Sequence, residues 1–213
     1  LERANLHKRF AIYMLRITGS GSPLKLVLGF MLTTAVLSMW ISNTATILMM
    51  LPMAIAIINA VDNPRFGVAL ILGIAYSASL GGVGTPIGTP PNIIFMSVYE
   101  ETLGIEYSFI DWMKTGVPIV ILGVPIMALW LARGIKEVGN INLPVPGTWT
   151  KAEKRVLAIF GTVALAWIFR PFWTAWIGVS TISDSTIAVA GVAAMFLTNS
   201  GNDNGEADDK GNN

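Results

Sequence analysis

The chain contains no cysteine, a single histidine and few charged residues. Without cysteine it can form neither a disulfide framework nor a thiolate metal site. Charged residues make up 13% of the 213 residues, whereas soluble domains carry about 25%. Apolar residues make up 53%, and the mean hydropathy is +0.62. This composition predicts an integral membrane protein, and with a net charge of +1 no nucleic-acid partner is expected.

Two long stretches lack charge altogether, and each is interrupted by polar residues at its centre. The first covers residues 26–61 and has Ser-Asn-Thr at 42–44. The second covers residues 66–99, and its centre at 81–92 is rich in glycine and proline. Irregular backbone at membrane depth is tolerated only where it is buried in protein or lines a watery cavity. Each interruption is therefore a candidate binding site, and paired broken helices are typical of transporters.

The lengths of these stretches predict how they enter the membrane. As helix, the 36 residues of 26–61 would extend about 54 Å, whereas two full crossings need about 60 Å and a turn. A re-entrant hairpin with its tip near Asn43 fits better, and two short tilted spans are the alternative. In the second stretch, the glycines and prolines at 81–91 predict a half-helix, an unwound loop and a second half-helix, with Thr89 outside helical geometry.

The other segments complete an all-α membrane protein. Residues 156 to about 178 are predicted as one continuous span, with Arg170 near an end from which its charge can reach the interface. A shorter helix begins at Ser185, where Ser183 or Asp184 can cap it. The predicted organisation is an interfacial amphipathic helix and linker at 1–25 (alternatively a solvated linker helix), a re-entrant hairpin at 26–61, a broken transmembrane helix and outer loop at 62–114, a transmembrane helix and cytoplasmic linker at 115–155, two further helices at 156–198, and a polar tail at 199–213.

The basic residues predict an orientation. Lysine and arginine concentrate in residues 1–25 and 133–155, while the loop at 100–114 has only Lys114. By the positive-inside rule the first two segments lie in the cytoplasm and the third lies outside. A hairpin that returns to the inside, followed by a broken helix that crosses outward, satisfies this pattern, and so do two full spans.

The membrane segments offer oxygen and amide groups rather than catalytic groups. They contain no Asp, Glu, Lys or His near mid-depth, so no proton relay, transition-metal site or enzyme activity is expected. Hydroxyls, amides and unwound backbone carbonyls suit an alkali cation, and the N-terminal ends of half-helices suit the carboxylates of an anion. The alternative is that these small polar residues only hold helices together.

Two motifs at these interruptions resemble the first-repeat signatures of the divalent anion:sodium symporter family. The residues that carry the resemblance are Leu37-Ser38-Met39-Trp40-Ile41-Ser42-Asn43-Thr44-Ala45-Thr46 and Gly88-Thr89-Pro90-Pro91-Asn92. The family takes up dicarboxylates, tricarboxylates and sulfate with sodium, using two inverted repeats. The resemblance implies a sodium site at Ser38, Ser42, Asn43 and Gly88. It implies substrate contacts at Ser42, Asn43, Thr44, Thr89 and Pro90.

The chain departs from the family pattern in one respect. It contains no second Ser-Asn-Thr and no second Gly-Thr-Pro, and residues 150–198 resemble the opening helices of a second repeat. We therefore expect this sequence to carry about half of a binding site, and the missing initial methionine favours a fragment of a longer protein.

The resulting functional prediction is sodium-coupled uptake of a small divalent anion across the cell (inner) membrane. A site with no Arg or Lys needs sodium and helix dipoles to offset a dianion, so the cation should bind first. The resemblance also implies an elevator-type movement and a homodimer. The alternatives are a sodium-independent dicarboxylate exchanger on the same scaffold, and a channel or structural membrane subunit.

Overall fold

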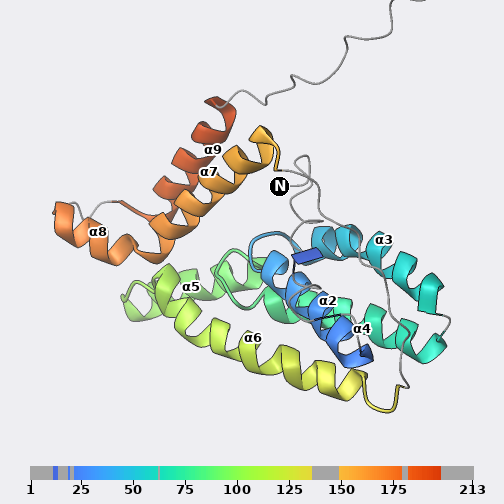
Figure 1. Cartoon of the computed structure of the whole chain (residues 1–213). Helices are drawn as coiled ribbons and strands as arrows, with labels where there is room; N and C mark the ends of the chain where they lie inside the picture. The colour runs from blue at the N-terminus through green and yellow to red at the C-terminus, as the bar shows by residue number, and fades with distance from the viewer. Residues whose placement is uncertain are drawn as a thin grey trace, which may run out of the picture. The chain divides into compact units, whose positions relative to one another are not determined.

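The computed structural model describes residues 12–13, 19, 22–61, 63–135, 149–178 and 182–197. All regular structure in these residues is α-helical, which confirms the predicted fold class, and the chain divides into two compact units (Figure 1). One contains the described residues up to 135, and the other those from 149 onward. Nearly all of the predicted interfacial helix and the whole polar tail lie outside the described residues.

Both predicted interruptions are present in the first unit. The helices of this unit are α2 (Pro23–Ser38), α3 (Asn43–Val61), α4 (Pro64–Gly81), α5 (Pro90–Leu103) and α6 (Phe109–Leu131). A tight turn at 39–42 joins α2 to α3, and an irregular loop at 82–89 separates α4 from α5. Among the described helices, α3, α4 and α6 are each long and apolar enough to cross a membrane.

Close packing of α2 against α4 brings the two interruptions together. Gly73 of α4 faces the side chain of Met31, and Gly81 faces the backbone of Ala35, so the two helices run parallel. A Cβ atom at Gly81 would lie only 2.6 Å from the Ala35 Cα atom, which means that only glycine permits this approach. Because the helices end side by side, the turn at 39–42 lies next to the loop at 82–89.

Helix α6 packs antiparallel to α4 and also reaches the loop. Gly123 faces the side chain of Leu80. Two helical turns earlier, Gly116 faces the carbonyl of Val83. The side chains at the centre of this unit are fully buried and include Phe30, Met50, Phe66, Leu70 and Val124. The loop is therefore supported by α2 and α6, and the apolar core lies further from it along the helices.

In the second unit, the predicted continuous span from 156 to 178 is wrong. The chain forms α7 (Lys151–Ile168) and α8 (Arg170–Ile177), which are bent by 74° at the break, followed by α9 (Asp184–Leu197). Pro171 explains the break, because a proline lacks the N–H donor and its ring clashes with the carbonyl four residues earlier.

The prediction that Arg170 reaches the membrane interface is also wrong. Arg170 is 7% exposed, and its Nε atom lies 3.0 Å from an oxygen of Asp184 at the start of α9. Its Nη1 atom donates to the carbonyl of Ile182 at 3.2 Å. The guanidinium therefore holds α9 at the bend between α7 and α8. The predicted cap of α9 is confirmed for Ser183, whose hydroxyl accepts from the Thr186 N–H at 3.3 Å.

Candidate binding site at the hairpin turn and the unwound loop

The turn at 39–42 and the loop at 82–89 contact each other directly. The Thr85 hydroxyl donates a hydrogen bond to the carbonyl of Met39, and Thr85 itself is fully buried. Gly82 packs against the Asn43 side chain, so closely that an added Cβ atom would lie 2.8 Å from the amide oxygen. The two polar interruptions, forty residues apart in the sequence, thus form one site.

Three oxygen atoms converge at the buried side of this site. The hydroxyl oxygen of Ser38 lies 2.6 Å from the Asn43 Oδ1 atom and 2.7 Å from the carbonyl oxygen of Ala78. A hydroxyl has one hydrogen, so it can donate to only one of these two acceptors. With the amide oxygen toward Ser38, one of the short contacts joins two oxygens with no proton between them, whereas turning the amide by half a turn puts its NH₂ group against Ser38 and satisfies both contacts. A cation at this point would remove the repulsion, and hydroxyl, amide and carbonyl oxygens are suitable sodium ligands.

Gly88 completes a continuous set of contacts with these residues. It is buried against Gly82, where an added Cβ atom would lie 2.9 Å from the Gly82 Cα atom. Gly82 in turn touches Asn43, which touches Ser38. Of the predicted sodium residues, Ser38 and Asn43 are in direct contact. Gly82 lies between Gly88 and Asn43 and touches both.

The fourth predicted sodium residue, Ser42, has a structural role in the observed conformation. Its side chain is exposed, and its hydroxyl accepts from the Ala45 N–H at 3.3 Å, which caps the start of α3. The N–H groups of Asn43 and Thr44 have no hydrogen-bond acceptor within the described part of the chain. The first turn of α3 thus offers free donors at its positively polarised end.

The residues predicted for the substrate alone, Thr44, Thr89 and Pro90, lie nearer the surface than Ser38 and Gly88, which were predicted for sodium alone. Thr44 and Pro90 are exposed, and Asn43 and Thr89 are half-buried, whereas Ser38 is fully buried. No hydrogen bond within the described residues uses the hydroxyl of Thr44 or of Thr89. An anion could therefore reach these hydroxyls from outside, with the cation position on the buried side.

The start of α5 differs from the expected anion-binding helix end. Thr89 is extended, with φ −150° and ψ 143°, as its position before a proline predicts. Pro90 and Pro91 have no N–H group, and the N–H of Asn92 is bonded to the Thr89 carbonyl at 3.1 Å. The first turn of α5 therefore provides a helix dipole but few free donors, and an anion there would depend on the Thr89 hydroxyl.

Asn92 holds the loop in place, a role that the sequence analysis did not assign to it. Its side chain is 6% exposed, and its Nδ2 atom donates to the carbonyls of Gly82 at 2.7 Å and Thr85 at 2.9 Å. Both amide hydrogens are thus used. From α6, the Trp112 indole donates to the Val83 carbonyl at 2.7 Å. These two side chains satisfy carbonyls that an unwound backbone would otherwise leave unpaired.

Thr46 carries a polar group that the fold leaves unsatisfied. It is fully buried in the first turn of α3, and its hydroxyl has no hydrogen-bond partner in the described structure. Because it follows Asn43 by three residues, its side chain lies on the same side of α3. A buried hydroxyl without a partner is costly, so this atom is a candidate contact for a bound ion or water.

Comparison with known proteins identifies the family. A family profile described as "Citrate transporter" matches residues 1–207. The chain belongs to this family. It is also 35% identical, over 92% of its length, to the sodium-dependent dicarboxylate transporter SdcS of Staphylococcus aureus strain USA300 and to the same transporter of strains NCTC 8325 and COL. The match covers 42% of each relative, so the chain spans less than half of their length.

This membership confirms the resemblance predicted from the two motifs at Leu37–Thr46 and Gly88–Asn92. The protein is a multi-pass integral membrane protein of a transporter family. Members named in the comparison are transporters rather than enzymes. The site described above lies within the matched region and contains the two motifs.

Proposed function

We propose that the intact protein couples inward sodium movement to the uptake of a small divalent anion, such as a dicarboxylate. The observation that supports this most strongly is the group formed by Ser38, Asn43 and Ala78, in which the Ser38 hydroxyl oxygen lies 2.6 Å from the Asn43 amide oxygen and 2.7 Å from the Ala78 carbonyl oxygen. The charge-free surroundings, residues 26–61 and 66–99, contain no basic side chain that could neutralise an anion. The name of the relative, a sodium-dependent dicarboxylate transporter, agrees with this proposal.

The Asn43 amide provides the coupling in this proposal. With sodium bound, its oxygen coordinates the ion, and its NH₂ group is turned away from the ion and can donate to an anion. Without sodium, rotation of the amide by half a turn lets the NH₂ group donate to Ser38, whose hydroxyl then donates to Ala78. The amide oxygen, which can only accept, then faces the anion in place of the NH₂ group. Sodium binding therefore prepares the anion site, and the cation binds first.

The anion lies at the exposed side of the site. Its carboxylates accept from the Thr44 and Thr89 hydroxyls and from the free N–H groups at the start of α3, and Pro90 lines the site. Ser42 contributes to both ligands once its hydroxyl is released from the Ala45 N–H. The intact protein would supply a second set of groups of this kind, since one set surrounds only part of a dianion.

The transport assay uses the intact protein in liposomes. An inward sodium gradient should drive saturable accumulation of succinate or citrate, and Ser38→Ala should lower the apparent affinity for sodium. Ser97→Ala is the matched control, because Ser97 is exposed on α5 and its hydroxyl bonds only within its own helix. Uptake that needs internal substrate and no sodium would instead indicate an exchanger. Linear flux without saturation would indicate a channel.

We also propose that α2 and α3 form a re-entrant hairpin and that α4 with α5 crosses the membrane. Because residues 1–213 contain no cysteine, single engineered cysteines can report topology once any cysteine elsewhere in the intact protein is replaced. Cysteines at Lys25 and Asp62 should react with an impermeant reagent from the cytoplasmic side only. A cysteine near Asn43 that reacts readily with a bulky reagent from the opposite side would overturn the hairpin, and two tilted spans would replace it.

A further inference from the structure

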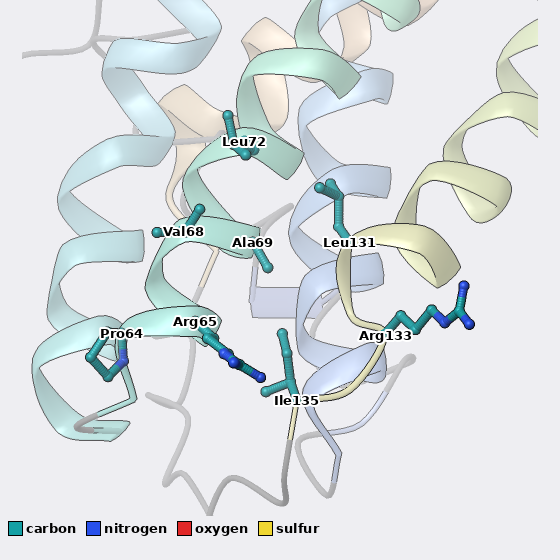
Figure 2. A pocket seen from close by; sticks show the side chains of 8 residues that line it. All are labelled: Pro64, Arg65, Val68, Ala69, Leu72, Leu131, Arg133 and Ile135. Carbon is teal, nitrogen blue, oxygen red and sulfur yellow. The ribbon is translucent and has the colours of Figure 1, made fainter.

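A groove lies at the end of the first unit where α4 begins and α6 ends. Figure 2 shows the side chains that line it, and its volume is about 460 Å³. Its walls are apolar and include Val68 and Leu72 of α4 and Leu131 of α6. Two arginines, Arg65 and Arg133, also line it. The groove thus has apolar walls along the helices and positive charge at the helix ends.

Local sequence fixes the two arginines at the same end. The Asn63 side chain caps α4 by accepting from the Arg65 N–H at 3.1 Å, which places Arg65 in the first helical turn. After α6, Gly134 adopts φ +74°, a conformation that glycine reaches without strain. The turn carries Arg133 and returns Ile135 to the apolar core. In Figure 2, Arg65 extends toward Ile135, and Arg133 extends outward from the rim.

The charge of these arginines is not compensated within the described residues. Neither side chain forms an ion pair or a hydrogen bond there, and no acidic residue lines the groove. In addition, Arg65 lies at the start of α4, where the helix dipole disfavours a positive charge. An anion at this point would be attracted by both guanidinium groups and by the helix end.

We propose that this groove binds an anionic phospholipid. The phosphate accepts from Arg65 and is attracted by the charge of Arg133 at the rim, and an acyl chain lies along Val68, Leu72 and Leu131. Val68 is 58% exposed and Leu72 is 37% exposed, so apolar surface is open to such a chain. Basic pockets between membrane helices on the cytoplasmic side are typical binding sites for anionic headgroups, and the orientation predicted from the basic loops puts this end in the cytoplasm. This proposal does not depend on the transported ion or anion.

The test measures lipid binding to the purified intact protein by native mass spectrometry, with phosphatidylglycerol and phosphatidylcholine of identical acyl chains. We expect preferential binding of phosphatidylglycerol, reduced severalfold by Arg65→Gln and Arg133→Gln and retained by Arg65→Lys. Leu72→Trp should also reduce it, because the larger ring fills the groove without changing the charge. Lys114→Gln is the matched control, since Lys114 is exposed near the opposite end of α6.

Two outcomes would overturn the proposal. If Arg65→Gln binds phosphatidylglycerol as the wild type does, the groove is not the site. If Lys114→Gln causes the same loss as Arg65→Gln, the lipid responds to the overall charge of the protein rather than to this groove. Thermal unfolding of each variant in phosphatidylcholine, compared with that of the wild type, separates loss of lipid binding from loss of fold, and retention by Arg65→Lys provides a second check.

Discussion

Replacement of Asn92 by leucine should loosen the loop at 82–89 and weaken sodium binding. The change removes both N–H donors of the amide and puts an apolar side chain of similar size in its place. The Thr85 carbonyl would still accept from the Gly88 N–H at 3.3 Å, so it keeps a partner. The Gly82 carbonyl accepts no other hydrogen bond within the described residues. The free energy that holds the loop in place should therefore fall by the cost of one buried unsatisfied carbonyl, about 1–3 kcal/mol, rather than by the cost of two.

This energy predicts a measurable shift in sodium affinity. At about 1.4 kcal/mol per factor of ten, the ratio of ordered to unordered loop falls by a factor of about 5 to 150. If sodium binds only to the ordered loop, the sodium concentration needed for half-maximal uptake rises in proportion to the fall in the ordered fraction, and that factor of about 5 to 150 is its upper limit. The assay is sodium-dependent succinate uptake by reconstituted intact protein, together with thermal unfolding in the presence and absence of sodium.

The matched control is Asn59→Leu, which makes the same chemical change at an exposed position on α3. It should leave both measurements unchanged. If Asn92→Leu keeps the sodium dependence and stability of the wild type, Asn92 does not hold the loop. If stability falls while the sodium dependence is unchanged, the loop does not contribute to the cation site.

Three further changes test other parts of the structure. Thr46→Val should leave the stability of the sodium-free protein unchanged or raise it, because the change removes an unpaired hydroxyl. It should reduce uptake if that hydroxyl contacts a ligand. Unchanged uptake would assign Thr46 to packing alone. Arg170→Met should destabilise the second unit by less than the roughly 3–5 kcal/mol expected when one partner of a fully buried ion pair is removed, because Asp184 is 31% exposed. The double variant Arg170→Met with Asp184→Leu should recover most of the lost stability, measured by thermal unfolding. Gly81→Ala should force α2 and α4 apart and abolish saturable uptake, so wild-type uptake would show that their close approach is not required.

The sequence was most informative where a residue has a strong backbone preference. Pro90 fixes Thr89 in extended geometry, and the glycines around it cannot sustain a helix, so the loop was predictable from local chemistry alone. The two charge-free stretches, residues 26–61 and 66–99, then marked the membrane segments, with the interruptions at their centres. Pro171 is the same kind of residue, but the apolar residues on both sides of it favoured a continuous span, so the break before α8 was not predicted.

Roles that depend on tertiary contacts could not be predicted from the sequence. An asparagine in an unwound segment can bind an ion or hold the backbone, and only the fold of the loop shows that Asn92 donates to two carbonyls. Arg170 at a helix end normally reaches solvent, and its burial depends on where α9 returns. Trp112 resembles an interfacial tryptophan, yet its indole bonds to the Val83 carbonyl.

The most direct test of the central claim is equilibrium binding of radioactive sodium to the purified intact protein with no anion present. If the oxygens of Ser38, Asn43 and Ala78 form the cation site and sodium binds first, the wild type should bind sodium saturably. Ser38→Ala should lose most of this binding, and Ser97→Ala should keep it. Saturable sodium binding that is equal in Ser38→Ala and the wild type, or that appears only after an anion is added, would contradict the account.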